Sequence, residues 1–217
     1  MVTIYGVYRS RASRNIWLLN ELGQPFKHVP VIQAGRAASP AGAGLIHTRS
    51  PEFLAVNPNG HIPSMEDDGL VLHESLAINL YLAKKYGGPL AAKDVREDGL
   101  MGMWTLWAAT ELEPHAINIL YHTVYKPAAE RDPKIAAAAI EASKAPFAVL
   151  DKALAASGYL VGGRFTVADI NVAEVVKYAA PAKELFAAAP NVKGWLDACQ
   201  SRKGYKDMIA KRDAEPA

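Results

Sequence analysis

The spacing of hydrophobic residues changes near residue 88 of this 217-residue chain. Before that point, short runs rich in β-forming residues alternate with stretches in which apolar residues recur every three or four positions. After it, β-forming runs almost vanish and alanine-rich helical spacing dominates. The pattern therefore predicts an α/β unit followed by an all-helical unit.

The first unit is predicted to contain four strands and two main helices. The strands should lie at residues 2–8, 26–32, 62–66 and 70–73, with helices between Ser13 and Gly23 and from Ser75 to Tyr86. Residues 67–69, Asp-Asp-Gly, favour a tight turn, so the last two strands should form an antiparallel hairpin. A short crossover makes the first two strands parallel, and a four-stranded mixed sheet results.

The remaining segments complete the expected domain plan. Residues 33–50 are rich in Gly, Ala, Ser and Pro without a sustained period, which predicts a long loop with at most short helical turns. We expect an N-terminal domain over residues 1–86, a linker over 87–95 and a helical bundle over 96–217. The bundle helices should lie near residues 96–125, 133–156, 166–180 and 190–210.

Composition narrows the class of protein. The 24 basic and 22 acidic side chains leave a net charge of +2 and are spread along the chain, so no nucleic-acid partner is expected. No window approaches the roughly 18 consecutive apolar residues of a membrane span, so no membrane partner is expected either. The single cysteine, Cys199, cannot form an internal disulfide, which favours the cytoplasm.

Four motifs carry a family resemblance. Residues 57–63 read Asn-Pro-Asn-Gly-His-Ile-Pro, 72–75 read Leu-His-Glu-Ser, 77–82 read Ala-Ile-Asn-Leu-Tyr-Leu and 160–170 read Leu-Val-Gly-Gly-Arg-Phe-Thr-Val-Ala-Asp-Ile. In this order they resemble the cytosolic glutathione S-transferase family, in particular its bacterial-type, serine-using members. The resemblance implies a thioredoxin-like domain that holds glutathione, and a helical domain that holds a small apolar electrophile to which the thiolate is conjugated. It also implies a homodimer in which the first domain of one subunit packs on the second domain of the other.

The resemblance also assigns glutathione-binding residues. Ile62 should pair its backbone with the tripeptide as an added strand, ahead of a cis bond to Pro63. Glu74 and Ser75 should meet the γ-glutamyl end, because the start of a helix attracts a carboxylate. The basic side chains expected near the glycyl carboxylate are His47, Arg49 and His61.

Ser10 is the predicted catalytic residue, and Tyr8 is the second choice. Ser10 lies between the first strand and the first helix, where serine-using members carry their activating hydroxyl. A free thiol with a pKa near 8.5 is only a few per cent ionised at neutral pH, so the enzyme must lower that pKa. A hydroxyl does this as a hydrogen-bond donor to sulfur, with no triad. Tyrosine-using members place their donor on or just after the first strand, which keeps Tyr8 as a rival, whereas Tyr5 fits the core and Ser13 a helix cap.

The second unit offers side chains for the electrophile pocket. The candidates are Met103, Trp104, Trp107, His115, Leu120 and Tyr121. Pro114 should kink or end the helix in this region. Thr166 and Asp169 have the spacing of a capping box, which is a structural role. No metal site is expected, because His115 and His122 have no further ligands at suitable spacing.

Two other functions stay open. Residues 9–13, Arg-Ser-Arg-Ala-Ser, are similar to the Ser-Ser-Cys motif of the maleylacetoacetate isomerase class, but Arg11 and Ala12 replace its second serine and its cysteine. A non-catalytic protein that binds glutathione or a hydrophobic ligand is the second alternative. Disulfide-reducing relatives carry a cysteine at the first helix, and none occurs here before Cys199, so that chemistry is not expected.

Overall fold

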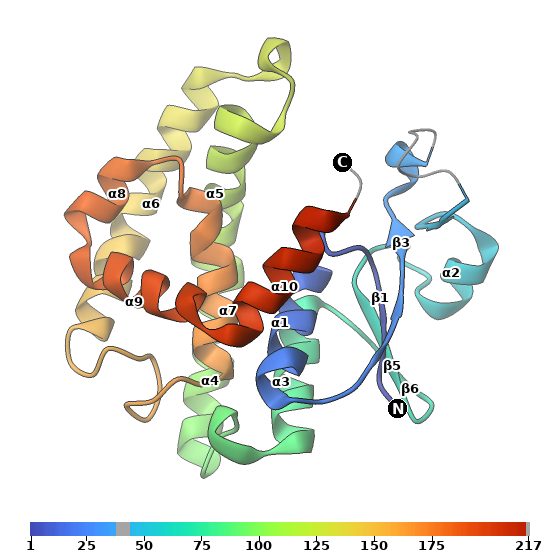
Figure 1. Cartoon of the computed structure of the whole chain (residues 1–217). Coiled ribbons are helices and arrows are strands. Elements are labelled where there is room, and N and C mark those ends of the chain that lie inside the picture. Colours follow the sequence, from blue (N-terminus) through green and yellow to red (C-terminus); the bar gives the residue numbers. More distant parts are fainter. Residues whose placement is uncertain (38–43, 216–217) are drawn as a thin grey trace. The chain divides into compact units, whose positions relative to one another are not determined.

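The computed structural model describes residues 1–37 and 44–215, which fall into two compact units (Figure 1). Unit 1 contains Met1–Tyr86 and the described residues from Arg202 onward, and unit 2 contains Gly87–Ser201. The predicted loop at 33–50 is described only in part, because residues 38–43 lie outside the described residues.

Unit 1 is built on the four-stranded mixed sheet that the sequence predicts. Its strands are β1 (Thr3–Tyr5), β2 (Lys27–Val29), β5 (Ser64–Asp67) and β6 (Leu70–His73), in the order β2-β1-β5-β6. β1 is parallel to β2 and antiparallel to β5, and β5 and β6 form the expected hairpin. Both turn residues of the hairpin, Asp68 and Gly69, have positive φ, which matches the twist of the flanking strands.

The predicted strand at 26–32 is interrupted. Pro30 separates β2 from β3 (Val31–Ile32), because proline has no N–H to donate to a strand ladder. β3 pairs in parallel with β4 (Ile46–His47), a short strand inside the segment that was expected to be a loop. A 3-10 turn, η1 (Ala34–Arg36), follows β3, and α2 (Pro51–Val56) follows β4.

Two helices of unit 1 pack together on one face of the sheet (Figure 1). They are α1 (Ala12–Leu22) and α3 (Ser75–Tyr86), and α3 has the predicted bounds. The Nδ2 of Asn15 donates to the carbonyl oxygen of Ser75 at 2.8 Å and to Oδ1 of Asn79 at 2.7 Å. Because all three groups are buried, this amide network fixes α1 and α3 relative to each other.

The last helix, α10 (Lys203–Ala214), groups with unit 1 and lies along α1, whereas the sequence pattern assigned it to the helical bundle (Figure 1). The Nε and Nη2 of Arg202 donate to Oε2 of Glu21 at 3.0 and 2.8 Å. The rings of Trp17 and Tyr205 meet edge to face, with centroids 4.9 Å apart. Helical spacing predicts a helix here but does not identify the surface against which the helix packs.

Unit 2 is all helical, as the spacing predicts. Its α-helices are α4 (Val95–Trp107), α5 (Glu113–Leu120), α6 (Pro133–Leu154), α7 (Val167–Val176), α8 (Lys183–Ala188) and α9 (Pro190–Ser201). Every residue of α7 is buried, so this helix forms the centre of the unit. Pro114 lies in the first turn of α5, directly after a π-helical turn over Ala108–Leu112, where the missing N–H is accommodated by a wider turn. Among the described helices, none has both the length and the hydropathy to cross a bilayer.

The start of α7 forms the predicted capping box. The N–H of Thr166 donates to Oδ2 of Asp169 at 2.8 Å, and the Thr166 side chain meets the N–H of Asp169 in return. Oδ1 of Asp169 accepts the indole N–H of Trp195 at 2.9 Å and the N–H of Leu160 at 3.1 Å. Burial raises the pKa of Asp169, and these hydrogen bonds oppose that rise. One buried carboxylate therefore joins the helix start, the preceding loop and α9.

Candidate active site

Gly6 marks the point in unit 1 where the chain leaves β1 and passes close to its neighbours. Its φ is +139°, and a Cβ built on it would lie 3.0 Å from the Cβ of Ala12. The same point is 3.4 Å from Oγ of Ser10 and 3.4 Å from Cβ of Ile62. The positive φ and the close approach of Ala12 both favour glycine at position 6, and Ser10 and Ile62 lie around the same point.

The hydroxyl of Ser10 already has two partners. Its Oγ donates to the carbonyl oxygen of Val7 at 2.7 Å and accepts the N–H of Ala12 at 3.1 Å. Ser13, the cap expected from the sequence, is not the N-cap: α1 begins at Ala12, and Arg11 occupies the cap position without a side-chain bond. Since Ser10 Oγ accepts one of the free N–H groups of the first turn, it takes over part of the role predicted for Ser13.

The two tyrosines near this loop have different surroundings. Tyr8 packs edge to face against His28, with ring centroids 4.8 Å apart. Burial and the nearby charge of Glu215 raise the pKa of Tyr8. Tyr5 is half-buried rather than fully in the core, and its hydroxyl donates to Oε2 of Glu66 at 3.0 Å. Tyr5 is thus engaged on the sheet, while Tyr8 lies beside the Ser10 loop.

Asn57 organises the turn that leads to Ile62. Its buried Nδ2 donates to the carbonyl oxygen of His61 at 2.8 Å and to Oγ of Ser64 at 3.0 Å. The bond between Ile62 and Pro63 is cis, as expected. The ladder between β1 and β5 starts with Tyr5 opposite Ser64, so Ile62 precedes it. Ile62 and the cis proline therefore lie in the segment that leads directly into β5, the strand between β1 and β6.

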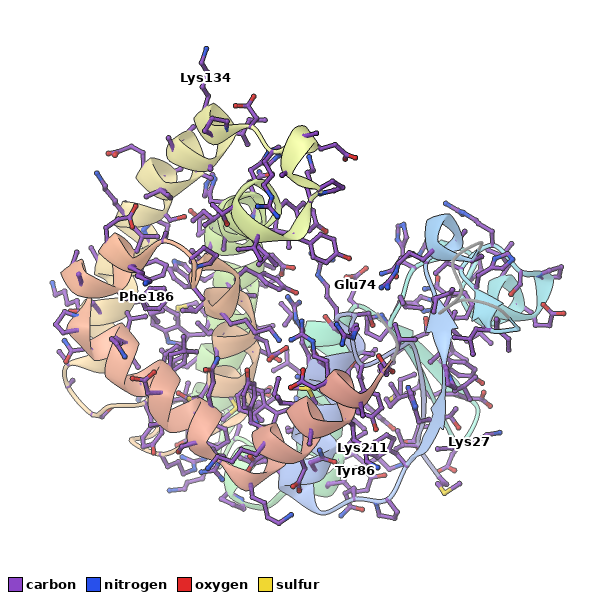
Figure 2. All side chains as sticks on the ribbon, turned by 45° about the horizontal axis from the view of Figure 1, so that its top comes forward. Lys27, Glu74, Tyr86, Lys134, Phe186 and Lys211 are labelled. Carbon is purple, nitrogen blue, oxygen red and sulfur yellow. The ribbon has the colours of Figure 1, made fainter. Side chains whose placement is uncertain are left out.

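Glu74, labelled in Figure 2, lies between β6 and α3 and has a strained backbone conformation. Its φ is +65°, a region that non-glycine residues rarely adopt and that is often retained at functional sites. Its side chain is exposed, whereas Ser75, the first residue of α3, is buried. Nη1 of Arg14 donates to Oγ of Ser75 at 3.1 Å. The start of α3 thus combines helix N–H groups, a hydroxyl and a guanidinium, all of which favour an anion.

Arg14 is an additional candidate for the site, and the sequence did not indicate its position. Beside Arg9 and Arg11 it reads as part of a basic loop, but it lies in α1 and is 1% exposed. A buried arginine next to the γ-glutamyl candidate Ser75 is a stronger functional signal than surface charge.

Of the three basic residues predicted near the glycyl carboxylate, His47 and Arg49 are in direct contact. Nδ1 of His47 accepts the N–H of Arg49 at 3.2 Å. Nη1 of Arg49 is 2.8 Å from the point where a Cβ on Gly60 would lie, so its guanidinium covers the turn beside His61. Arg49 and His61 are exposed. The contacts therefore join His47 to Arg49, and Arg49 to the 57–63 turn that contains His61.

The residues of unit 2 that were predicted to line the electrophile pocket divide into core and surface residues. Trp104 is buried and meets Trp107 edge to face at 5.2 Å, so Trp104 is a packing residue. Met103 is exposed, and the others, Trp107, His115, Leu120 and Tyr121, are half-exposed. His122 has a structural role, since its Nδ1 accepts the N–H of Asp132 at 2.9 Å. In the part of the chain that the structure describes, no three His, Cys, Asp or Glu side chains are grouped to hold a metal ion.

These features define a class of protein. A thioredoxin-like sheet carries a cis proline before its central antiparallel strand, a hydroxyl in the loop after β1 and an anion-attracting start of α3. This combination suits an extended ligand with an anionic end, and a helical unit follows it in the chain.

The chain belongs to the glutathione S-transferase family. Residues 4–90 match the family model described as Glutathione S-transferase, N-terminal domain, and residues 113–203 match Glutathione S-transferase, C-terminal domain. Glutathione S-transferase GstB of Escherichia coli (strain K12) is 31% identical over 213 residues, which cover 96% of this chain and 98% of GstB. The chain is accordingly a glutathione transferase with glutathione as its co-substrate.

Two solved structures of similar chains contain glutathione or a conjugate of it. The theta class enzyme of Xanthomonas axonopodis pv. citri, with glutathione bound, has a TM-score of 0.80 at 28% identity and covers 96% of both chains. Glutathione S-transferase I from maize, in complex with an atrazine glutathione conjugate, has a TM-score of 0.83 at 26% identity and covers 99% of both chains.

Proposed function

We propose that this chain conjugates the thiolate of glutathione to a small apolar electrophile, and that Ser10 stabilises the thiolate. The observation that carries the proposal is the proximity of Ser10 Oγ and Ile62 Cβ, each 3.4 Å from one point beside Gly6. A tripeptide that pairs with the Ile62 backbone brings its thiol next to this hydroxyl. Tyr8 is the second choice, and its ring packs against His28.

The existing hydrogen bond of Ser10 limits what the hydroxyl can contribute. To donate to a thiolate, Oγ must give up the carbonyl oxygen of Val7. A neutral hydrogen bond is worth about 0.5–1.5 kcal/mol and a charged one about 1.5–3, so the net gain is about 1–1.5 kcal/mol. That gain lowers the thiol pKa by about one unit. The start of α1 adds little to this lowering of the thiol pKa, because the N–H of Ala12 in its first turn already donates to Ser10 Oγ.

The ends of glutathione are assigned by charge. The γ-glutamyl carboxylate would bind at the start of α3, on Ser75 and its partner Arg14, and the exposed Glu74 would meet the ammonium group. The glycyl carboxylate would bind near Arg49 and His61, with His47 behind them. The support is the charge of these groups and the exposure of Glu74, Arg49 and His61 in unit 1.

The test is the titration of bound glutathione by the ultraviolet absorbance of its thiolate. In the wild type the thiol pKa should fall by about one unit, and in Ser10→Ala it should return to nearly the free value, with roughly tenfold less conjugation of an activated aryl halide at pH 6.5. Tyr8→Phe is the matched control and should keep the shift.

Other outcomes of this titration select other functions. A shift lost in Tyr8→Phe but kept in Ser10→Ala would make Tyr8 the donor. An unshifted pKa with glutathione bound and no conjugation in any of the three proteins would favour the non-catalytic binding protein. Turnover of a cis-enone isomerisation substrate without net loss of glutathione would favour the isomerase.

A homodimer is also part of the proposal. Leu100, Met103 and Leu106 are exposed and recur every third position of α4, so they form an apolar stripe on one side of the helix. Sedimentation should give a mass near twice the 23.4 kDa of one chain. Leu106→Glu should shift the protein toward monomer, whereas Val149→Glu, at a similarly exposed position (52% against 67%), should not.

A cytoplasmic location completes the proposal. Cys199 is the single cysteine, so the chain forms no internal disulfide, and its side chain is buried, which suits a reducing compartment. Fractionation of cells that express the chain would test it, and recovery in an oxidising compartment would contradict it.

A further inference from the structure

Glu215, directly after α10, connects the end of the described chain to the loop that carries Ser10. Its Oε1 accepts the backbone N–H of Tyr8 at 2.8 Å, and its Oε2 accepts the N–H of Arg9 at 2.9 Å. Each oxygen of one carboxylate thus binds one of two consecutive amides. Hydrogen bonds to an ionised acceptor are about twice as strong as neutral ones, so this contact is a firm attachment for a loop.

The antiparallel packing of α10 on α1 explains how Glu215 reaches this loop. The Nδ2 of Asn20, near the end of α1, donates to the carbonyl oxygen of Gly204, near the start of α10, at 3.1 Å. The two helices have 11 and 12 residues, and therefore nearly equal lengths. The end of α10 consequently lies beside the loop that precedes α1. The N–H of Glu215 donates to the carbonyl oxygen of Lys211 at 3.2 Å, so the helix also orients this residue.

Apart from the ring contact of Tyr8 with His28, the other described contacts of the loop lie on either side of Tyr8 and Arg9. The N–H of Gly6 donates to the carbonyl oxygen of Val29 at 3.0 Å, and Nε2 of His28 lies 2.6 Å from the carbonyl oxygen of Gly6. On the other side, the N–H and Oγ of Ser10 both donate to the carbonyl oxygen of Val7. Glu215 fixes the two peptide groups between these attachments.

We propose that Glu215 is a positioning residue for catalysis: by holding the N–H groups of Tyr8 and Arg9 it fixes the direction in which Ser10 presents its hydroxyl. The inference rests on the proposed function, in which Ser10 stabilises the glutathione thiolate. Glu215 does not touch the reacting atoms. It acts through the backbone of the loop.

The charge of Glu215 and its positioning role have opposite effects on the thiol. A carboxylate near a thiolate disfavours the charged form, so by charge alone the loss of Glu215 would lower the thiol pKa. Arg9 and Arg11, both exposed in the same loop, partly offset that charge. Loss of positioning would instead raise the pKa, because Ser10 would no longer be held against the sulfur. The sign of the change therefore separates the two effects.

The experiment compares the full chain with Glu215→Ala, Glu215→Asp and the control Asp213→Ala, which removes an exposed carboxylate from the same helix end. We expect Glu215→Ala to raise the pKa of bound glutathione by about one unit and to lower kcat roughly tenfold at pH 6.5, with KM for glutathione within about twofold. Glu215→Asp keeps both acceptor oxygens and should recover part of the loss. Asp213→Ala should match the wild type.

Amide hydrogen exchange supplies a readout that does not depend on activity. In Glu215→Ala the N–H groups of Tyr8 and Arg9 should exchange faster, while those of α3 remain unchanged. A fall in thiol pKa, or unchanged kcat with faster exchange of these two amides, would overturn the inference. If the wild type itself shows no thiolate shift, the proposed function fails instead, and unchanged exchange in Glu215→Ala would show that the attachment is absent in solution.

Discussion

Arg164 holds Glu97 in a bidentate ion pair within unit 2. Nη1 donates to Oε1 at 2.8 Å and Nη2 donates to Oε2 at 2.7 Å. The same guanidinium donates from Nε to the carbonyl oxygen of Pro89 at 3.1 Å and from Nη2 to that of Ala91 at 2.8 Å. One side chain from the loop before α7 therefore fastens both α4 and the segment that precedes it, which requires the planar fork of an arginine.

This pair should give the protein a defined acid sensitivity. The hydrogen bonds of Arg164, together with that of the Lys93 backbone N–H, lower the pKa of Glu97 from 4.5 to about 2. Because the folded-state pKa is depressed, the contribution to stability is complete above about pH 4.5 and is lost as the pH falls toward 2. The difference in thermal midpoint between wild type and Glu97→Gln should be constant from pH 5 to 8 and shrink below pH 4.5. Glu130→Gln, at an exposed position, is the control, and an equal pH dependence there would contradict the assignment.

Two adjacent glycines provide a matched test of the same contact. Gly162 and Gly163 have nearly identical φ values of +64° and +63°, so alanine is equally strained at both. A Cβ at Gly162 would overlap the Arg164 guanidinium and the Glu97 carboxylate, whereas the nearest atom to a Cβ at Gly163 is 4.0 Å away. Gly162→Ala should therefore be less stable than Gly163→Ala by about 1–3 kcal/mol in urea unfolding. Equal losses would show that the pair moves aside without cost.

Most of the fold could be predicted because it follows from local signals. The period of apolar residues fixed α3, and the Asp-Gly turn fixed the β5–β6 hairpin. Errors arose where tertiary contacts decide the outcome. Pro30 interrupts the predicted strand at 26–32, and β3 after it pairs with β4 instead. α10 reads as a helix from its spacing, but only its contacts with α1 assign it to unit 1.

The candidate site was predictable only where motifs mark it. The 57–63 motif predicted the cis bond before Pro63 and made Ile62 a candidate, and the predicted start of a helix made Ser75 a candidate. Arg14 could not be recognised from the sequence, because a charged residue usually lies at the surface and this one is buried against Ser75. Glu215 was missed altogether, since it lies 206 residues after Arg9 and the sequence near the end of the chain carries no sign of that partner.

The packing of α10 on α1 can be tested at its closest point. A Cβ on Gly204 would lie 2.7 Å from Oε1 of Glu21, the residue that also accepts from Arg202 and from the indole of Trp17. Gly204→Ala should cost about 1–3 kcal/mol of stability. Gly194→Ala, in α9 with nothing within 4 Å, should instead gain about 0.5–1 kcal/mol from helix propensity. A stable Gly204→Ala variant would mean that α10 is held more loosely than its contacts indicate.

Glu74 offers a test of whether backbone strain is retained for function. Its φ of +65° suits glycine, and a side chain there costs roughly 1–2 kcal/mol. Glu74→Gly should therefore be more stable than Glu74→Ala by about 1 kcal/mol, part of the relief being offset by the entropy of glycine. Both variants remove the carboxylate proposed to meet the ammonium of glutathione, so both should raise KM for glutathione to a similar extent. Urea unfolding and initial rates measure the two effects separately. If Glu74→Gly gained stability and kept its KM for glutathione, the backbone strain would have no connection with ligand binding. A stabilised protein with weakened glutathione binding would show that the site retains an unfavourable backbone in order to present this side chain.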